Sequence, residues 1–193
     1  MGAPTNRADE MKTLYVSTRE AWREWLAKHH DKEDEIWLVY YRKHTGKPRI
    51  SYNDAVEEAL CFGWIDSIQR GIDEERFAQR FSPRRKGSAW SETNKERLRR
   101  LIEAGEMTPA GLAAAGHALE DDGFVIAADI MEALKGDKEA WRNFQGFPEP
   151  YKRIRIGFIE GARKRPEEFR RRLDHFLQMT RQNKRFGYVE KFR

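Results

Sequence analysis

This chain of 193 residues has a single cysteine, Cys61, and no long apolar stretch. One cysteine permits no internal disulfide, which favours a reducing compartment. No apolar run approaches the roughly 20 residues that a membrane-spanning helix needs. The first ten residues lack the apolar core of a secretory signal. We therefore expect a cytoplasmic protein without a transmembrane segment.

The sequence also lacks the motifs of several enzyme classes. It has no G-x-x-x-x-G-K-[ST] loop and no G-x-G-x-x-G, and no serine stands in a G-x-S-x-G elbow. The histidines form no H-x-x-x-H or H-E-x-x-H pair, and one cysteine cannot build a thiolate cluster. We expect no metal and no cofactor, and the balance favours a protein that is not an enzyme.

Charged residues are abundant but unevenly spread. They make up 36% of the chain, with a net charge of +5. The net charge is −2 over residues 1–66, +5 over 67–100, −7 over 101–150 and +9 over 151–193. Basic blocks can bind polyanions, but acidic and basic segments can equally pair with each other inside a fold. Both interpretations stay open.

Hydrophobic patterning predicts an α+β fold. A small, mainly antiparallel sheet with helices is expected in the N-terminal half, and a helical C-terminal half follows. The expected strands are 14–16, 36–41, 65–72 and 76–81. Caps predict helix starts at Ser17, Ser51, Ser91 and Thr108, and further helices are expected at 125–144, 149–164 and 166–182, with a break at Gly136. Gly63 suits a left-handed helix stop.

This pattern predicts a simple domain organisation. We expect an α+β core domain over residues 12–95 and a helical C-terminal region over 96–185 that packs on it. Residues 1–11 are expected to form a disordered lead.

The segment from residue 59 to residue 94 combines tryptophans, arginines and polar groups around a Pro/Gly/Ser-rich turn. Guanidinium groups bind carboxylates and phosphates and stack on tryptophan, and the helix starting near residue 91 would expose its first amides. These properties predict an anion pocket. The candidate ligand-binding residues are Trp64, Asp66, Arg80, Arg84, Trp90, Ser91 and Asn94.

The same residues allow other roles. In a structural clamp, Arg80 or Arg84 would pair with Asp66, and Ser91 would only cap a helix. Asp66 could instead act as a general base beside a tryptophan. Cys61, on an apolar helix, is expected to be buried and inert.

A basic amphipathic pattern follows near the C-terminus. The candidate basic surface consists of Arg153, Arg155, Arg163, Lys164 and Arg165. Such a helix can bind nucleic acid, an acidic protein or a membrane surface, although the same pattern is also typical of a solvated helix face.

The runs Glu57–Ser67 (EEALCFGWIDS), Arg80–Arg85 (RFSPRR) and Ser88–Asn94 (SAWSETN) resemble the YdeI/OmpD-associated family, also labelled bacteriocin-protection proteins. The resemblance extends from about residue 12 to residue 185. It implies a link to bacteriocin or antimicrobial-peptide resistance and an outer-membrane porin partner. The family's C-terminal basic helix usually carries a Thr-Arg pair where this chain has Pro166 and Glu167.

Three functions fit these observations. The first is a non-enzymatic module that binds an anionic ligand or polyanion through the residues above. The second is an enzyme on a small phosphorylated or carboxylated metabolite, with Asp66 as acid/base. The third is a stress-linked interaction protein whose basic C-terminal helices dock a partner. The ligand, the partner and the oligomeric state stay open.

Overall fold

A computed structural model describes residues 11–120 and 124–187. Of the predicted disordered lead, only Met11 lies within the described residues. The chain divides into two compact units, each described by itself. The N-terminal unit comprises residues 1–88 and 101–117, and the C-terminal unit comprises 89–100 and 118–193. The predicted domain boundaries stay a prediction.

The N-terminal unit is built on a four-stranded mixed sheet with strand order β1-β2-β4-β3. β1 runs parallel to β2, and the other two pairings are antiparallel. The elements are β1 (Thr13–Leu14), α1 (Arg19–His29), β2 (Ile36–Tyr41), the 3₁₀ helix η1 (Lys43–Thr45), α2 (Tyr52–Cys61), β3 (Trp64–Gly71), β4 (Arg76–Pro83) and α4 (Pro109–Ala115). α3 (Glu92–Glu103) and the 3₁₀ helix η2 (Gly116–Leu119) contribute residues to both units. The α+β fold is confirmed.

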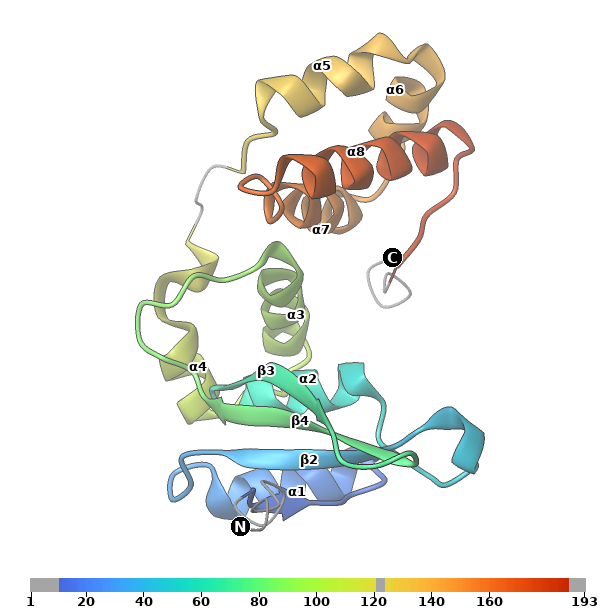
Figure 1. Ribbon diagram of the computed structural model, residues 1–193. Coiled ribbons are helices and arrows are strands. Elements are labelled where there is room, and N and C mark those ends of the chain that lie inside the picture. Colours follow the sequence, from blue (N-terminus) through green and yellow to red (C-terminus); the bar gives the residue numbers. More distant parts are fainter. Residues whose placement is uncertain (1–10, 121–123, 188–193) are drawn as a thin grey trace. The chain divides into compact units, whose positions relative to one another are not determined.

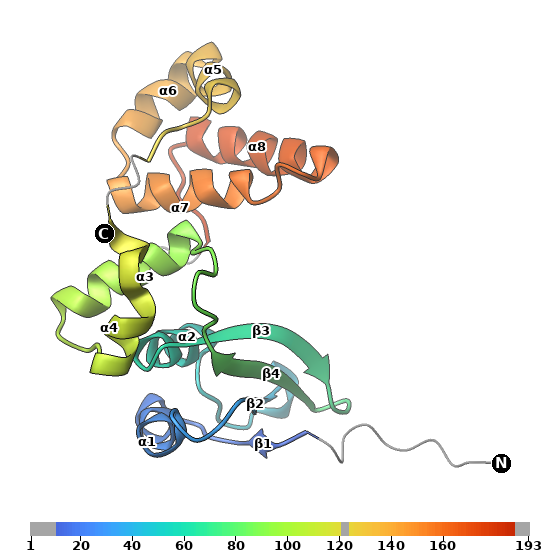
Figure 2. The ribbon, with the colours of Figure 1, turned by 90° about the vertical axis from the view of Figure 1, so that its left-hand side faces the viewer.

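Strand alternation decides which side chains of β4 face the helices. Phe81 lies opposite Ile36 of β2, whereas Arg80 lies opposite Trp37. The ring of Phe81 contacts Trp22 of α1, with 5.4 Å between the ring centroids. α1 and α2 lie side by side on this face of the sheet (Figure 1 and Figure 2). Because neighbouring residues of a strand point to opposite faces, Arg80 faces away from these helices.

Local capping explains where the first helices begin and end. Ser51 caps α2 as predicted, because its side chain accepts a hydrogen bond from the Asp54 amide at 3.0 Å. Gly63, with φ +76°, is the predicted left-handed stop after α2. The cap predicted at Ser17 is wrong by one residue. Thr18 has the extended backbone of a cap, and its hydroxyl accepts from the Ala21 amide at 3.2 Å.

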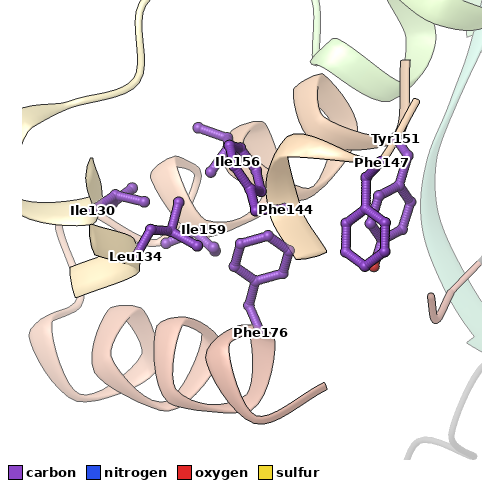
Figure 3. Packing of buried hydrophobic residues seen from close by; sticks show 8 residues of the cluster. All are labelled: Ile130, Leu134, Phe144, Phe147, Tyr151, Ile156, Ile159 and Phe176. Atoms are coloured by element: carbon purple, nitrogen blue, oxygen red, sulfur yellow. The ribbon is translucent and has the colours of Figure 1, made fainter. Parts of the chain in front are cut away.

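Four helices form most of the C-terminal unit, as predicted. They are α5 (Ala128–Gly136), α6 (Lys138–Gln145), α7 (Glu149–Glu160) and α8 (Pro166–Arg181). Figure 3 shows their shared apolar core, to which the four helices contribute Ile130, Leu134, Phe144, Tyr151, Ile156, Ile159 and Phe176. α5 ends at Gly136, and Asp137 caps α6 by accepting hydrogen bonds from two amides at 3.1 Å. No helix among the described residues is long and apolar enough to cross a membrane.

α4 approaches the end of α2 so closely that one position must be glycine. A Cβ built on Gly111 would lie 2.1 Å from the carbonyl oxygen of Cys61, far inside contact distance. Thr108, which caps α4, donates its hydroxyl to the same oxygen at 2.6 Å. The two helices can therefore meet only where α4 carries no side chain.

We expect Gly111→Ala to destabilise the protein by about 3 kcal/mol, because neither backbone can yield without strain. Urea unfolding followed by circular dichroism measures the loss. Gly71→Ala is the matched control, since its new methyl would meet only Arg42, at 3.9 Å. Equal stability of the two variants would contradict the close approach.

Candidate functional site

Asp66 and Arg80 lie on opposite faces of the sheet. Asp66 is paired with Phe81 and so faces the helices, where its Oδ2 accepts a hydrogen bond from the Tyr52 hydroxyl at 2.7 Å. Arg80 donates to Glu35 through Nε and Nη2, at 2.7 and 2.6 Å. The predicted clamp between Arg80 and Asp66 is therefore wrong, because the alternation of β4 separates the two side chains.

The two arginines of the predicted anion pocket have partners in the protein. The hydrogen bond from Arg80 lowers the pKa of Glu35, so the pair stays ionised and the charge of Arg80 is compensated. Arg84 is half-buried, its Nη2 donates to the Ser88 carbonyl at 3.3 Å, and burial lowers its pKa. Neither arginine pairs with Asp66, whose described partners are Tyr52 and Gln79.

The stacking role expected of Trp64 is wrong. Its side chain is only 1% exposed, and its Nε1 donates to the His30 carbonyl at 3.0 Å. The ring meets Trp25 edge-on, with 6.0 Å between centroids. Trp64 follows a helix that is buried on almost all sides, so its ring completes the apolar core and offers no surface to a ligand.

Three predicted ligand-binding residues belong to the C-terminal unit. Ser91 caps α3, since its hydroxyl accepts from the Asn94 amide at 3.3 Å. The Asn94 side chain accepts from Arg97 at 2.7 Å. Trp90 is half-buried. The binding role of these three residues stays a prediction.

Asp66 lines a cavity of about 540 Å³, here called the Asp66 pocket. Its chemistry comes from Tyr40, Arg49, Tyr52, Asp66, Phe77 and Gln79. The pocket lies on the helix side of the sheet, where α2 begins. Because Asp66 is not consumed by an arginine and adjoins a cavity, its proposed acid/base role stays a prediction.

Two adjacent glutamates of α2, which sequence reasoning missed, are buried at 0% and 1% exposure: Glu57 and Glu58. Arg19 of α1 donates to both and also to Glu106, at 2.6 Å. Arg23 donates to Glu58 at 2.6 Å. Burial acts to lower the pKa of Arg19, but the hydrogen bond and charge of Glu58, together with the charges of Glu106 and Glu57, outweigh it, so the pKa rises. The spacing of the two arginines, one turn apart, was the available signal.

Cys61 is buried, and burial raises the pKa of its thiol to about 11. The thiol is therefore protonated at neutral pH, as expected for an inert cysteine. Among residues 11–120 and 124–187, no three His, Cys, Asp or Glu side chains are grouped to hold a metal ion.

The predicted basic surface is partly neutralised within the C-terminal unit. Arg163 donates to Glu160 at 3.0 Å and to Asp129 of α5 at 3.1 Å. These hydrogen bonds raise the pKa of Arg163, with Glu160 the larger cause. Lys164 and Arg165 are exposed after the end of α7. Arg163 thus has carboxylate partners of its own, and the role of the five residues as a basic surface stays a prediction.

Arg153 and Arg155 on α7 are half-buried against aromatic rings. Arg153 lies over Phe124, 4.9 Å from the ring centroid. Arg155 lies over Phe158 at 5.4 Å and over Phe186 at 5.0 Å. Both contacts are cation–π interactions, which stabilise a guanidinium but leave its hydrogen-bond donors unused.

Arg155 lines a second cavity, of about 500 Å³, here called the Arg155 pocket. Its other functional side chains come from α7, α8 and the segment after α8. The residues are Arg155, Phe158, Arg171, Arg172, His175 and Phe186. Cationic and aromatic groups thus share one hollow of the C-terminal unit.

Two family models match the chain. Residues 14–114, just over half of the chain, match a domain of unknown function (DUF8412), and residues 124–183 match the model described as bacteriocin-protection, YdeI or OmpD-associated. The chain therefore carries a DUF8412 domain, followed at residues 124–183 by a domain of the YdeI/OmpD-associated family. A search of curated proteins and a search of solved structures found no match.

The YdeI/OmpD-associated match and the motif that suggested it lie in different segments of the chain. The match at 124–183 covers α5 to α8 and most of the Arg155 pocket. The motif between residues 57 and 94 lies within the DUF8412 match. The recognition of the family is confirmed, and the helices rather than the motif carry it.

We expect Arg19→Met to destabilise the N-terminal unit by about 3 kcal/mol, because it removes a cation that pairs with two buried carboxylates. Thermal and urea unfolding followed by tryptophan fluorescence measure this loss. The control is Arg76→Met, which removes an exposed pair with Asp73 and should leave the unfolding midpoint unchanged. A similar small effect for both variants would mean that the buried network contributes nothing.

Proposed function

We propose that this protein is a non-enzymatic module that binds a small anion with an aromatic or apolar part in the Arg155 pocket. The observation that carries the proposal is a half-buried guanidinium without an acceptor. Arg155 forms no hydrogen bond and no ion pair with any other residue of 11–120 and 124–187, and its Nε is fully buried. Burial lowers the pKa of Arg155, so the charged form is held against a desolvation cost.

Uncompensated charge in the pocket centres on Arg155. Arg171 and Arg172 both donate to Glu168, at 2.9 and 2.7 Å, so one carboxylate serves both cations. His175 lies edge-on to Phe186, 4.6 Å between ring centroids. An anion in the pocket would meet one arginine without a carboxylate and two arginines that share one. This arrangement favours an anionic ligand electrostatically.

The aromatic walls favour a ligand with an apolar part. Phe158 is 46% exposed, although it lies in a unit with a large apolar core. Arg172 stacks on its ring at 3.8 Å from the centroid and donates to its carbonyl at 2.6 Å. The exposed ring thus lines the pocket with the Arg172 guanidinium stacked on it. The volume of the Arg155 pocket, about 500 Å³, is within the range of small-molecule sites.

A small anion fits the charge distribution better than a polyanion. Arg163, which the sequence placed on a basic surface, is paired with two carboxylates. Nucleic-acid binding needs several cations that can neutralise successive phosphates. The family description names bacteriocin protection, and we propose that anion binding serves that role here.

Phenyl phosphate is a suitable probe, because it joins an anion to an aromatic ring. We expect saturable binding by calorimetry, with NMR shift changes at Arg155 and Phe158. Arg155→Met should weaken binding at least about tenfold, because a lost hydrogen bond to a charged group costs about 1.5–3 kcal/mol. Inorganic phosphate, which lacks the ring, should bind more weakly than phenyl phosphate.

Arg142→Met is the matched control, since it removes one positive charge from an exposed helix position of the same unit. It should leave phenyl phosphate binding unchanged. If both variants weaken binding equally, general surface charge is responsible and the pocket is not. Absence of saturable binding of phenyl phosphate would also overturn the proposal.

A further inference from the structure

The Asp66 pocket of the N-terminal unit holds two opposite charges that the protein leaves uncompensated. The Oδ2 atom of Asp66 accepts from Tyr52 at 2.7 Å and from Gln79 at 3.4 Å, while Oδ1 accepts no hydrogen bond from the described residues. No arginine, lysine or histidine of the described chain pairs with Asp66. The donors to this carboxylate are therefore a hydroxyl and an amide, both of them neutral groups.

Arg49 supplies the positive charge. Its Nη1 donates to the Tyr41 carbonyl at 3.1 Å, and no carboxylate of residues 11–120 and 124–187 forms an ion pair with it. Arg49 is half-buried and lines the same pocket as Asp66. The two side chains come from different parts of the sequence and form no ion pair with each other, so the pocket presents separate positive and negative positions.

Tyr40 gives independent evidence for a missing ligand. The residue is 2% exposed, its ring stacks on Phe77 with 5.1 Å between centroids, and its buried hydroxyl has no hydrogen-bond partner. Burial is the largest cause that raises the pKa of Tyr40, and electrostatic interactions with Tyr52 and Asp66 raise it further. The hydroxyl therefore stays protonated. Buried hydroxyls without a partner are rare in folded proteins. This one belongs to a residue that lines the same cavity as Asp66 and Arg49.

We propose that the Asp66 pocket binds a free α-amino acid, with the ammonium group at Asp66 and the carboxylate at Arg49. A simple anion would meet the repulsion of Asp66, and a simple cation would leave Arg49 uncompensated. A zwitterion satisfies both charges and offers the Tyr40 hydroxyl a partner. Ile50 and Phe77 supply an apolar wall, and the volume of about 540 Å³ accommodates an amino acid side chain.

The test uses the full chain and a set of free L-amino acids with small, aliphatic, aromatic and polar side chains. Thermal shift identifies the best binder, and calorimetry measures its affinity. Its amide lacks the carboxylate, and its N-acetyl derivative lacks the ammonium. Each analogue should bind at least about tenfold more weakly, because a site built for a charged group rejects a ligand without it.

Variants separate binding from folding. Asp66→Asn keeps an oxygen for Tyr52 and should abolish the preference for the free amino acid over its N-acetyl form. Tyr40→Phe should weaken binding without lowering the unfolding midpoint of the free protein, since its hydroxyl has no partner to lose. The control Asp73→Asn removes an exposed carboxylate of the same unit and should change neither quantity.

The outcomes distinguish this proposal from the anion site. Arg155→Met should leave amino acid binding unchanged, and Asp66→Asn should leave phenyl phosphate binding unchanged. If no amino acid binds saturably at about 1 mM, a weak affinity by any standard, the proposal fails. It also fails if Asp66→Asn binds both the free amino acid and the N-acetyl form like the unaltered protein.

Discussion

The two-residue period of β4 governs the chemistry of the N-terminal unit. Phe81 points to the helices and packs in the core. Arg80 therefore points to the other face of the sheet, where Glu35 accepts its hydrogen bond. Asp66, paired with Phe81, is thereby kept away from the arginine. A shift of one residue in this pairing would put a guanidinium into the core and close the pocket beside Asp66.

Buried charge is handled in two ways in this protein. Glu58 of α2 is buried against arginines of α1, and the pair of helices is held by a network in which each carboxylate has a cation. Arg155 and Asp66, by contrast, are partly buried beside cavities and have no oppositely charged partner among the described residues. A charge without a partner is costly in a protein. A bound ligand that supplies the opposite charge would therefore gain the most binding free energy at these two side chains.

Local chemistry made much of the fold predictable. The run Ile36–Tyr41 was placed within its observed bounds because β-branched and aromatic residues dominate it. The caps at Ser51 and Thr108 depend only on neighbouring amides. The site was not predictable in the same way. The face of the sheet to which the Asp66 side chain points depends on the pairing of β3 with β4 and on the irregularity between Asp66 and Gln69.

The environment of Arg155 is non-local for the same reason. In the fold, α8 brings further arginines to the cavity but places no carboxylate against Arg155. The sequence around α7 gives no indication of either fact. The segment that appeared most distinctive, from residue 59 to residue 94, instead supplied core residues such as Trp64 and one wall of the Asp66 pocket. Distinctive composition identified an important part of the fold, but the pairing of strands decided which residues meet a cavity.

The hydrogen bond from Thr108 to the Cys61 carbonyl has a consequence for how this protein can be divided. The N-terminal unit is discontinuous in sequence, because α4 returns to it after α3 has contributed to the other unit. A fragment that ends at residue 95 would lose α4 and uncover the end of α2. The shortest continuous fragment that contains this whole unit therefore extends past α4. Such a fragment also includes α3, most of which belongs to the other unit.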